Sequence, residues 1–385
     1  MALLGQGGRI RGVFDKFFSW FSHDIGIDLG TANTLVWVRG KGIVIREPSV
    51  VARHKKSKKI IAIGTEAKKM LGKTPSSIET VRPLRGGVIS DFDATEAMIA
   101  HYIREVHLVE SKLPRAFIHP KVVIGIPSSV TEVERRAVWE AALSAGARSA
   151  YLIEEPMAAA IGADISVFAP TGFLIVDIGG GTTEIAIISL GGIVVSKSLR
   201  FAGDDMDQAI LHYVRLRHGL LLGEKTAEDV KLNIGSAYDT KSKGTKQKAK
   251  VDNKDNAKDD IDKETGDRMA IVRGRDIETG LPRSLRLSEA EVREALAPII
   301  NQIIEGIADV LEEAPPDITP DILEHGILLT GGGANLPGLD KLIVERTHIP
   351  VIIADDPLTT VVRGTGKVLD DPILLSRVKV TGGLK

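Results

Sequence analysis

Apolar residues along the chain follow two alternating patterns. Short apolar runs bounded by glycine, proline or charged residues are typical of buried strands, and they lie at residues 24–29, 34–39, 42–46, 121–127, 150–156, 173–190 and 326–333. Segments with apolar residues every three or four positions are typical of helices, and they lie at 131–146, 157–163, 204–222, 226–236 and 288–313. Strands that alternate with helices predict an α/β fold.

Residues 9–22 form a separate pattern, in which bulky apolar residues share one face of a short helix. That face carries Ile10, Val13, Phe14, Phe17, Phe18, Trp20 and Phe21. The segment holds five of the aromatic residues of a chain that is only 4% aromatic, and Arg and Lys flank them. Such a helix could pack on its own domain, but Phe, Trp and basic residues at a chain end suit the membrane interface better. We therefore expect this segment to contact membrane lipid.

Residues 239–268 differ from the rest of the chain because they are highly charged. Five lysines between 241 and 250 precede an Asp-rich half, and Val251 and Ile261 are the only large apolar residues. A segment of this kind cannot bury enough surface to offset the entropy of ordering it. It is predicted to be a flexible surface loop, with contact to lipid or a partner as the less favoured alternative.

The composition excludes several classes of protein. The 385 residues are 43% hydrophobic and 26% charged, which is ordinary for a globular protein of two domains. A net charge of −1 gives no basic excess for nucleic acid. The absence of cysteine excludes disulfides and thiolate metal sites, and it fits a reducing cytoplasm. There is no apolar run of transmembrane length, and the N-terminus lacks the pattern of a signal peptide.

An internal repeat is the strongest sign of a function. Residues 28–34, DLGTANT, align without a gap with residues 177–183, DIGGGTT, and each copy lies between a buried strand and a second strand. A glycine turn between paired strands lets backbone N–H groups approach a bound group that a Cβ would obstruct. Hydroxyl donors are added by Thr31, Thr34, Thr182 and Thr183. Two equivalent turns predict a phosphate chain held between two related domains.

Each copy of the repeat begins with an aspartate at the end of a strand. Asp28 and Asp177 would face Mg²⁺, through its waters, because this ion keeps much of its hydration in proteins. A third glycine cluster at 329–335, LTGGGAN, follows the last strongly apolar strand. Its bare backbone can lie flat against a ring and a sugar. The three turns together predict a site for a nucleoside triphosphate and its metal.

The three turns resemble the phosphate-1, phosphate-2 and adenosine motifs of the superfamily that contains actin, sugar kinases and 70-kDa chaperones. Within it, the chain is similar to the MreB family of bacterial actins over residues 24–370, apart from 239–268, where it looks longer than typical members. The similar segments include IDLGTANTLVWVRGKGIV, RPLRGGVISDF, YLIEEPMAAAIGA, VDIGGGTTEIAIISLGGIV, GEKTAEDVK and LLTGGGANLPGLD. The resemblance implies an α/β, actin-like ATPase fold, with two related RNase H-like domains that flank a nucleotide cleft and each carry a small inserted subdomain.

The resemblance also implies the limits of these domains. The membrane helix would occupy residues 1–22. Domain I would span 23–160 plus 350–385, with its small subdomain at about 45–77. Domain II would span 161–349, with its small subdomain at about 198–284, including the charged insertion.

Site residues carried over by motif fall into two groups that would bind ATP. The phosphate group consists of Gly30, Thr31, Ala32, Asn33 and Thr34, with Gly179, Gly180, Gly181, Thr182 and Thr183 opposite. The adenosine group consists of Glu228, Lys231, Gly331, Gly332, Gly333, Ala334 and Asn335.

Glu155 corresponds to the family residue that orients the attacking water, with Thr182 assisting. Hydrolysis of the terminal phosphoanhydride bond of ATP needs an in-line water polarised by a nearby acceptor. Glu154 is the competing candidate, because successive strand residues point to opposite faces and only one of the pair should face the cleft. Alternatively, both glutamates form ion pairs at the domain junction.

By resemblance, the expected function is that of a filament-forming ATPase that uses ATP and Mg²⁺. The family assembles into antiparallel double filaments on anionic lipid at the inner face of the cytoplasmic membrane, where it organises lateral cell-wall synthesis and maintains rod shape. The partners implied are further copies of the chain and the cell-wall elongation proteins MreC, MreD and RodZ. No nucleic acid partner is expected.

Three other functions share this superfold. A small-molecule kinase would need a catalytic base over a substrate hydroxyl, and no separate sugar-binding motif is evident. A chaperone ATPase would carry a substrate-binding domain after the ATPase region, whereas this sequence ends at Lys385. A division actin would carry its membrane helix at the C-terminus, where this sequence has the polar tail RVKVTGGLK. A membrane-bound filament former is therefore the preferred interpretation.

Overall fold

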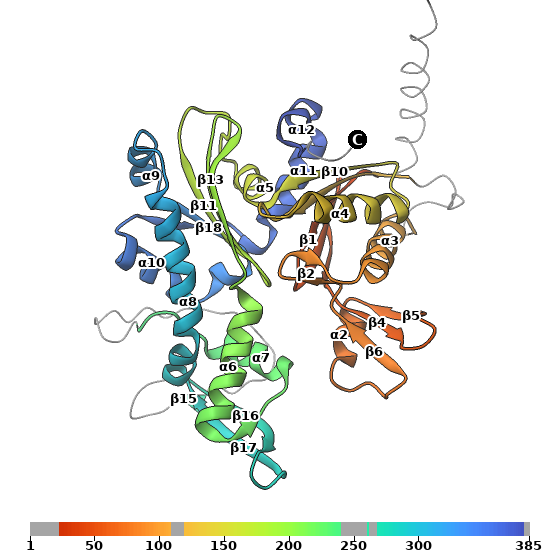
Figure 1. Ribbon diagram of the computed structural model, residues 1–385, viewed down its shortest axis with the longest axis vertical. Helices are drawn as coiled ribbons and strands as arrows, with labels where there is room; N and C mark the ends of the chain where they lie inside the picture. Colours follow the sequence, from red (N-terminus) through yellow and green to blue (C-terminus); the bar gives the residue numbers. More distant parts are fainter. Residues whose placement is uncertain (1–22, 109–118, 240–259, 262–267, 381–385) are drawn as a thin grey trace, which may run out of the picture.

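Two five-stranded sheets, one in each half of the molecule, form the framework of the structure (Figure 1). It is a computed structural model that describes residues 23–108, 119–239, 260–261 and 268–380. The predicted amphipathic helix at 9–22 lies outside the described residues, and so does most of the charged segment 239–268. Within the described ranges, no helix is long and apolar enough to cross a membrane.

The two sheets have the same topology. The first, in the order β10-β9-β1-β2-β3, consists of β1 (Ile25–Leu29), β2 (Asn33–Val38), β3 (Gly42–Pro48), β9 (Lys121–Ile126) and β10 (Ser149–Glu154). The second, in the order β13-β12-β11-β18-β19, consists of β11 (Phe173–Ile178), β12 (Thr183–Ser189), β13 (Gly192–Leu199), β18 (Ile327–Thr330) and β19 (Val351–Ile353). In each, the central strand pairs antiparallel with the strand after it and parallel with a strand much later in the chain. The repeat in the sequence is thus a repeat of the fold, and the α/β prediction is confirmed.

Helices cover the sheets, and two of them lie between the halves (Figure 1). The helices are α3 (Phe92–Leu108), α4 (Glu132–Ser144), α5 (Glu155–Gly162), α6 (Gly203–His218), α7 (Glu224–Ile234), α8 (Glu289–Glu312), α9 (Thr319–His325), α10 (Leu339–Thr347), α11 (Thr360–Asp370) and α12 (Pro372–Val378). Each half has its own apolar core. A third core joins α5 and α11 to residues of both sheets, including Val123 and Ile175. This shared core fixes the two halves against each other.

Helices α5 and α11 approach closely because glycines face each other at their contact. A Cβ at Gly162 would lie 1.9 Å from the carbonyl oxygen of Thr360, and one at Gly364 would lie 1.8 Å from that of Ala158. No side chain fits such a gap, since neither neighbour is a flexible side-chain end. The backbone of α5 is therefore held directly against α11, and the start of α5 is fixed with it.

Small subdomains extend from the same end of both halves (Figure 1). In the first half, α2 (Thr65–Met70) packs near a sheet of β4 (Val51–His54), β5 (Ile60–Ile63) and β6 (Ile78–Val81), followed by the hairpin of β7 (Leu84–Arg85) and β8 (Val88–Ile89). In the second half, α6 and α7 join a sheet of β14 (Leu220–Leu221), β15 (Asp260–Ile261), β16 (Arg268–Asp276) and β17 (Pro282–Ser288).

The structure differs from the sequence-based limits at three places. The small sheet of the first half runs from 51 to 81, whereas the small subdomain that contains it was expected at about 45–77. Strand β19 belongs to the second sheet, so that sheet continues past residue 349. Within the charged segment expected to be a loop, residues 260–261 pair antiparallel with β16. A two-residue strand stabilised by a neighbouring ladder gives no periodic signal in the sequence.

Candidate functional site

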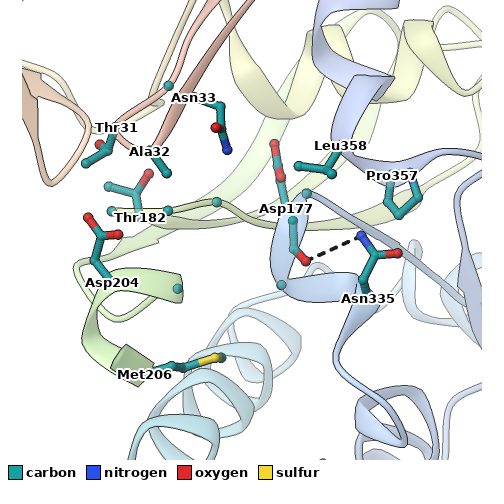
Figure 2. Close-up of a pocket in the computed structure, with 18 of the residues that line it drawn as sticks. Thr31, Ala32, Asn33, Asp177, Thr182, Asp204, Met206, Asn335, Pro357 and Leu358 are labelled. Carbon is teal, nitrogen blue, oxygen red and sulfur yellow. Dashed lines mark hydrogen bonds between the residues drawn. The ribbon is translucent and has the colours of Figure 1, made fainter. Parts of the chain in front are cut away.

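A cavity of about 400 Å³ lies between the two halves, where the glycine turns of both sheets meet. Figure 2 shows Thr31, Ala32 and Asn33 of the β1–β2 turn on one side and Thr182 of the β11–β12 turn facing them, with Asp177 between these turns and Asn335. The residues predicted from the sequence that line the cavity are Asp28, Gly30, Thr31, Ala32, Asn33, Glu155, Asp177, Gly179, Gly180, Gly181, Thr182, Glu228, Lys231, Gly331, Gly332, Gly333 and Asn335. Residues from five separate stretches of the chain are thereby brought together.

Three predicted residues do not line the cavity, and the expectation for them is corrected. Thr34 and Thr183 are fully buried, and their hydroxyls bond elsewhere: Thr34 to Ser49 Oγ at 2.8 Å and Thr183 to the Phe201 carbonyl at 2.7 Å. Each follows a cavity-lining residue at the start of a strand, so its side chain points to the opposite face. Ala334 is also buried, in the short 3₁₀ turn η2 (Gly332–Asn335).

The two glycine turns touch each other through bare backbone. A Cβ at Gly180 would lie 2.5 Å from Ala32 Cβ, and one at Gly181 would lie 2.5 Å from Thr31 Oγ1. Thr31 Oγ1 also accepts a hydrogen bond from the Gly87 amide at 3.1 Å. Because any side chain at these glycines would separate the turns, the glycine pattern is required by the approach of the two halves.

Three carboxyl groups converge at the inner end of the cavity. Burial raises the pKa of Asp28 to about 7. Burial and, secondarily, the charges of Asp28 and Glu184 raise the pKa of Asp177 to about 8. The pKa of Glu155 is also raised, first by burial and then by Glu184, Asp28 and Asp177. Ionising such a cluster without a cation is costly, so the site favours a ligand that brings positive charge.

The two aspartates fit a cation held mainly by other ligands. Within the described ranges, no group of three or more His, Cys, Asp or Glu side chains is arranged to hold a metal ion by itself. Asp28 and Asp177 stand at equivalent strand ends facing the cavity. Two carboxylates, with water and ligand phosphates completing the shell, match the usual coordination of Mg²⁺.

The structure separates the two adjacent glutamates. Glu155 lines the cavity, whereas Glu154 does not. The expected reason, alternation along a strand, is wrong, because β10 ends at Glu154 and Glu155 is the first residue of α5. Burial raises the pKa of Glu154, while the charge of Arg135 opposes that rise. The start of a helix locked against α11 gives Glu155 a fixed position at the cavity.

The outer end of the cavity combines charged pairs with apolar walls. Lys231 binds Asp207 at 2.8 Å and the Gly203 carbonyl at 2.7 Å. Glu228 is paired at 2.8 Å with Lys68 of the opposite half. The Asn335 amide donates to the Gly332 carbonyl at 3.4 Å. Apolar surface is supplied by Met206, Leu232, Leu336, Pro337, Pro357 and Leu358, as Figure 2 shows for three of them.

Several cavity residues were not predicted from the sequence. They include Gly87, which has a positive φ of 76°, and Gly203, Asp204, Met206 and Asp207 at the start of α6. The amides of Gly203 and Asp204 donate to the carbonyls of Gly179 and Gly180, so α6 begins directly beside the glycine turn between β11 and β12. A Gly-Asp-Asp stretch that opens a helix soon after a glycine turn is a signal that could have indicated that the start of α6 lines the cavity. Pro357 and Leu358 offer no comparable signal.

Comparisons with known proteins agree over nearly the whole chain. The family model described as MreB/Mbl protein matches residues 22–259 and 255–377. The cell shape-determining protein MreB of Escherichia coli (strain K12) is 47% identical over 362 residues, which cover 93% of this chain and 96% of that protein. The cell shape-determining protein Mbl of Bacillus subtilis (strain 168) is 43% identical over 361 residues, which cover 94% of this chain and all of that protein.

Solved structures have the same fold. MreB5 of Spiroplasma citri bound to ADP superposes with a TM-score of 0.79 at 37% identity, covering 92% of this chain and 98% of that one. The same protein bound to AMPPNP gives the same values. A MamK double helical filament superposes with a TM-score of 0.70 at 23% identity, covering 91% of this chain and 99% of that one. The fold is therefore the actin-like ATPase fold.

Proposed function

Because the chain belongs to the MreB/Mbl family, we propose that it is an ATP-dependent, filament-forming protein of the cell-shape cytoskeleton. One observation carries the proposal: two equivalent glycine turns face each other across the cavity, with Asp28, Asp177 and Glu155 at its inner end. The named relatives determine cell shape. A related structure was solved with ADP and with AMPPNP, which supports a nucleoside phosphate as the ligand of this cavity.

ATP would lie with its phosphates between the turns and its adenosine at the outer end. Backbone N–H groups at bare glycines, together with Thr31 and Thr182, are suited to bind phosphate oxygens. The apolar walls and the glycines at 331–333 offer flat surface to a base. Glu228 and Lys231 also line the cavity and would contact the adenosine. Each half holds part of the ligand, so binding would favour closure of the cleft.

Hydrolysis would depend on Glu155 and a divalent cation. Mg²⁺, held through water by Asp28 and Asp177, would neutralise charge that develops on the phosphates. Glu155 would accept a hydrogen bond from the attacking water and orient it toward the terminal phosphate. Thr182, which lines the cavity and is 7% exposed, would assist in holding that water. Glu155 would accept this hydrogen bond best as the charged carboxylate, a form that burial disfavours by raising its pKa and that a positive charge nearby favours.

Filament formation can be tested directly on the purified chain. With ATP and Mg²⁺ on a lipid monolayer, we expect paired filaments in electron micrographs, and we propose that the two strands run antiparallel. As a control, Gly181→Val should abolish both nucleotide binding and filaments, because its side chain would collide with Thr31. Filaments that form equally well without nucleotide would contradict coupling of ATP to assembly. Absence of polymer under all conditions would contradict the filament itself.

Membrane attachment is proposed for the segment at 9–22, which would place the filament at the inner face of the cytoplasmic membrane. Replacing Phe14, Phe17, Phe18, Trp20 and Phe21 with serine should release the protein from anionic liposomes, because each aromatic side chain contributes about 1.5–3 kcal/mol of apolar burial. Co-sedimentation with liposomes measures this release. As a matched control, Ser19→Ala and Ser22→Ala should leave sedimentation unchanged. Undiminished binding of the serine variant would place the lipid contact elsewhere.

The cell-wall elongation proteins MreC, MreD and RodZ are proposed as partners of the attached filament.

A further inference from the structure

Glu184 is a buried acidic residue that breaks the symmetry of the repeat. It is the second residue of β12 and is 1% exposed. It pairs across the sheet with Asp177, while the equivalent neighbour of Asp28 in the first half is Leu35. Two acidic side chains at directly opposite positions of a sheet repel each other. An apolar residue serves at the equivalent place in the first half, so the fold itself does not require a carboxylate there.

The carboxylate of Glu184 joins the two halves of the molecule. Its Oε2 accepts hydrogen bonds from the Ser128 amide at 3.1 Å and from the Ser128 hydroxyl at 2.6 Å. Ser128 follows β9, in the first sheet. The other carboxylate oxygen of Glu184, Oε1, accepts a hydrogen bond from the hydroxyl of Ser198, which lies in β13 of the second sheet. One oxygen thus bonds across the junction, while the other bonds within its own half.

The bond between Ser128 and Glu184 lies next to the residue proposed to orient water. Strands β9 and β10 run parallel, with Ile126 beside Glu154. Ser128 is two residues beyond Ile126, and Glu155 is one residue beyond Glu154. Ser128 and Glu155 therefore follow the ends of two neighbouring strands. Glu184 is also close enough to raise the pKa of Glu155 and of Asp177. It does not line the cavity, so it can act on a ligand only through these neighbours.

We propose that Glu184 is a positioning residue: through Ser128 it fixes the strand ends of the first half against the second, and thereby places Glu155 relative to the phosphate turns. This inference rests on the proposed ATPase function. The bond joins the two halves, so the orientation of Glu155 depends on how the halves are placed against each other. Small displacements of a positioned group have large effects on rate, while binding of the nucleotide depends on other residues.

Two serines on the same carboxylate offer a matched pair of variants. Ser128→Ala should lower kcat for phosphate release by roughly tenfold, because it removes a hydrogen bond to a charged group at the junction. The dissociation constant for the nucleotide should stay within about twofold, since Ser128 does not touch the cavity. Ser198→Ala removes a bond of the same chemistry inside one half and should change kcat by less than about twofold. Ser128→Thr keeps the hydroxyl and should restore most of the rate.

Glu184→Gln tests the carboxylate itself, with a loss in kcat at least as large as that of Ser128→Ala and a similar affinity for nucleotide. Rates are expressed per nucleotide-binding site, so a loss of folded protein does not count as a loss of kcat. Equal effects of Ser128→Ala and Ser198→Ala would overturn the proposal, as would a change confined to KM. Failure of the threonine variant to recover would also count against it.

The same assay separates this inference from the proposed function. If the wild-type chain hydrolyses ATP and Glu155→Ala abolishes hydrolysis while Ser128→Ala has no effect, only the positioning role fails. If the wild-type chain does not hydrolyse ATP, the proposed function fails first. If Glu155→Ala is fully active, the role of Glu155 fails first, and the positioning role with it.

Discussion

Replacing Glu155 with alanine should leave nucleotide binding nearly unchanged and slow phosphate release by roughly 10²–10⁴-fold, the usual contribution of a positioned acid–base group. Glu155 lines the cavity next to Asp28 and Asp177, whereas the phosphates would be held mainly by backbone at the glycine turns. Removing it takes away the acceptor for the attacking water but few contacts with the ligand. Single-turnover phosphate release at saturating ATP and Mg²⁺, with the dissociation constant from titration, measures the two effects separately.

Glu154→Ala is the natural control for this experiment, because the two residues are adjacent and chemically identical. Glu154 lies outside the cavity, so its variant should hydrolyse ATP at close to the normal rate. If hydrolysis is coupled to polymer turnover, filaments of Glu155→Ala should also persist longer after ATP is added. A result in which Glu154→Ala is inactive and Glu155→Ala is active would reverse the assignment.

The sequence predicted the parts of the site that depend on backbone. The glycine turns at 28–34 and 177–183 are local features, because each needs bare residues between two strands, and the repeat indicated that they belong together. The structure brings both to one cavity with the glycines at 331–333. The sheet topology followed the same logic, since the two halves match strand by strand. Local chemistry that recurs at a fixed spacing can thus be interpreted without a structure.

What the sequence did not predict depends on side-chain direction and on long-range contacts. Thr34 and Thr183 were expected to donate to phosphate, but a step of one residue along a strand turns a side chain to the other face. The hairpin of β16 and β17 was not assigned, because the apolar residues of β16 are consecutive, at 269–272, rather than alternating, and only Val272 among them is buried. Glu184 was missed because its importance lies in Ser128, 56 positions away in the chain. No periodic pattern links such residues.

The raised pKa values of Asp28 and Asp177 make the stability of the ligand-free protein depend on pH. The pKa of Asp177 is about 8 in the folded chain against 3.8 for an ordinary aspartate, and that of Asp28 is about 7. Between pH 4 and pH 8 the folded state therefore keeps protons that the unfolded state has released. The free energy of unfolding should fall as pH rises through this window and level off above it. Binding of Mg²⁺ with nucleotide should release these protons and remove the dependence.

Asp177→Asn should therefore stabilise the empty protein while weakening its binding of Mg²⁺ and nucleotide. An amide has no charge to desolvate, so the free energy of unfolding of the variant should exceed that of the wild type by an amount that grows with pH. Between pH 5 and pH 8 this difference should grow by roughly 2 kcal/mol, which is about half of what about 1.4 kcal/mol per pH unit would give over that range. Denaturant unfolding across this pH range measures the gain. Calorimetry near pH 7 in buffers of different ionisation enthalpy should show fewer protons released on binding.

Asp93→Asn, on the exposed start of α3, should change neither quantity appreciably. If Asp177→Asn instead destabilised the empty protein at pH 8, the carboxylate would already be balanced by positive charge within the fold, and its role in holding a cation would lose its physical basis.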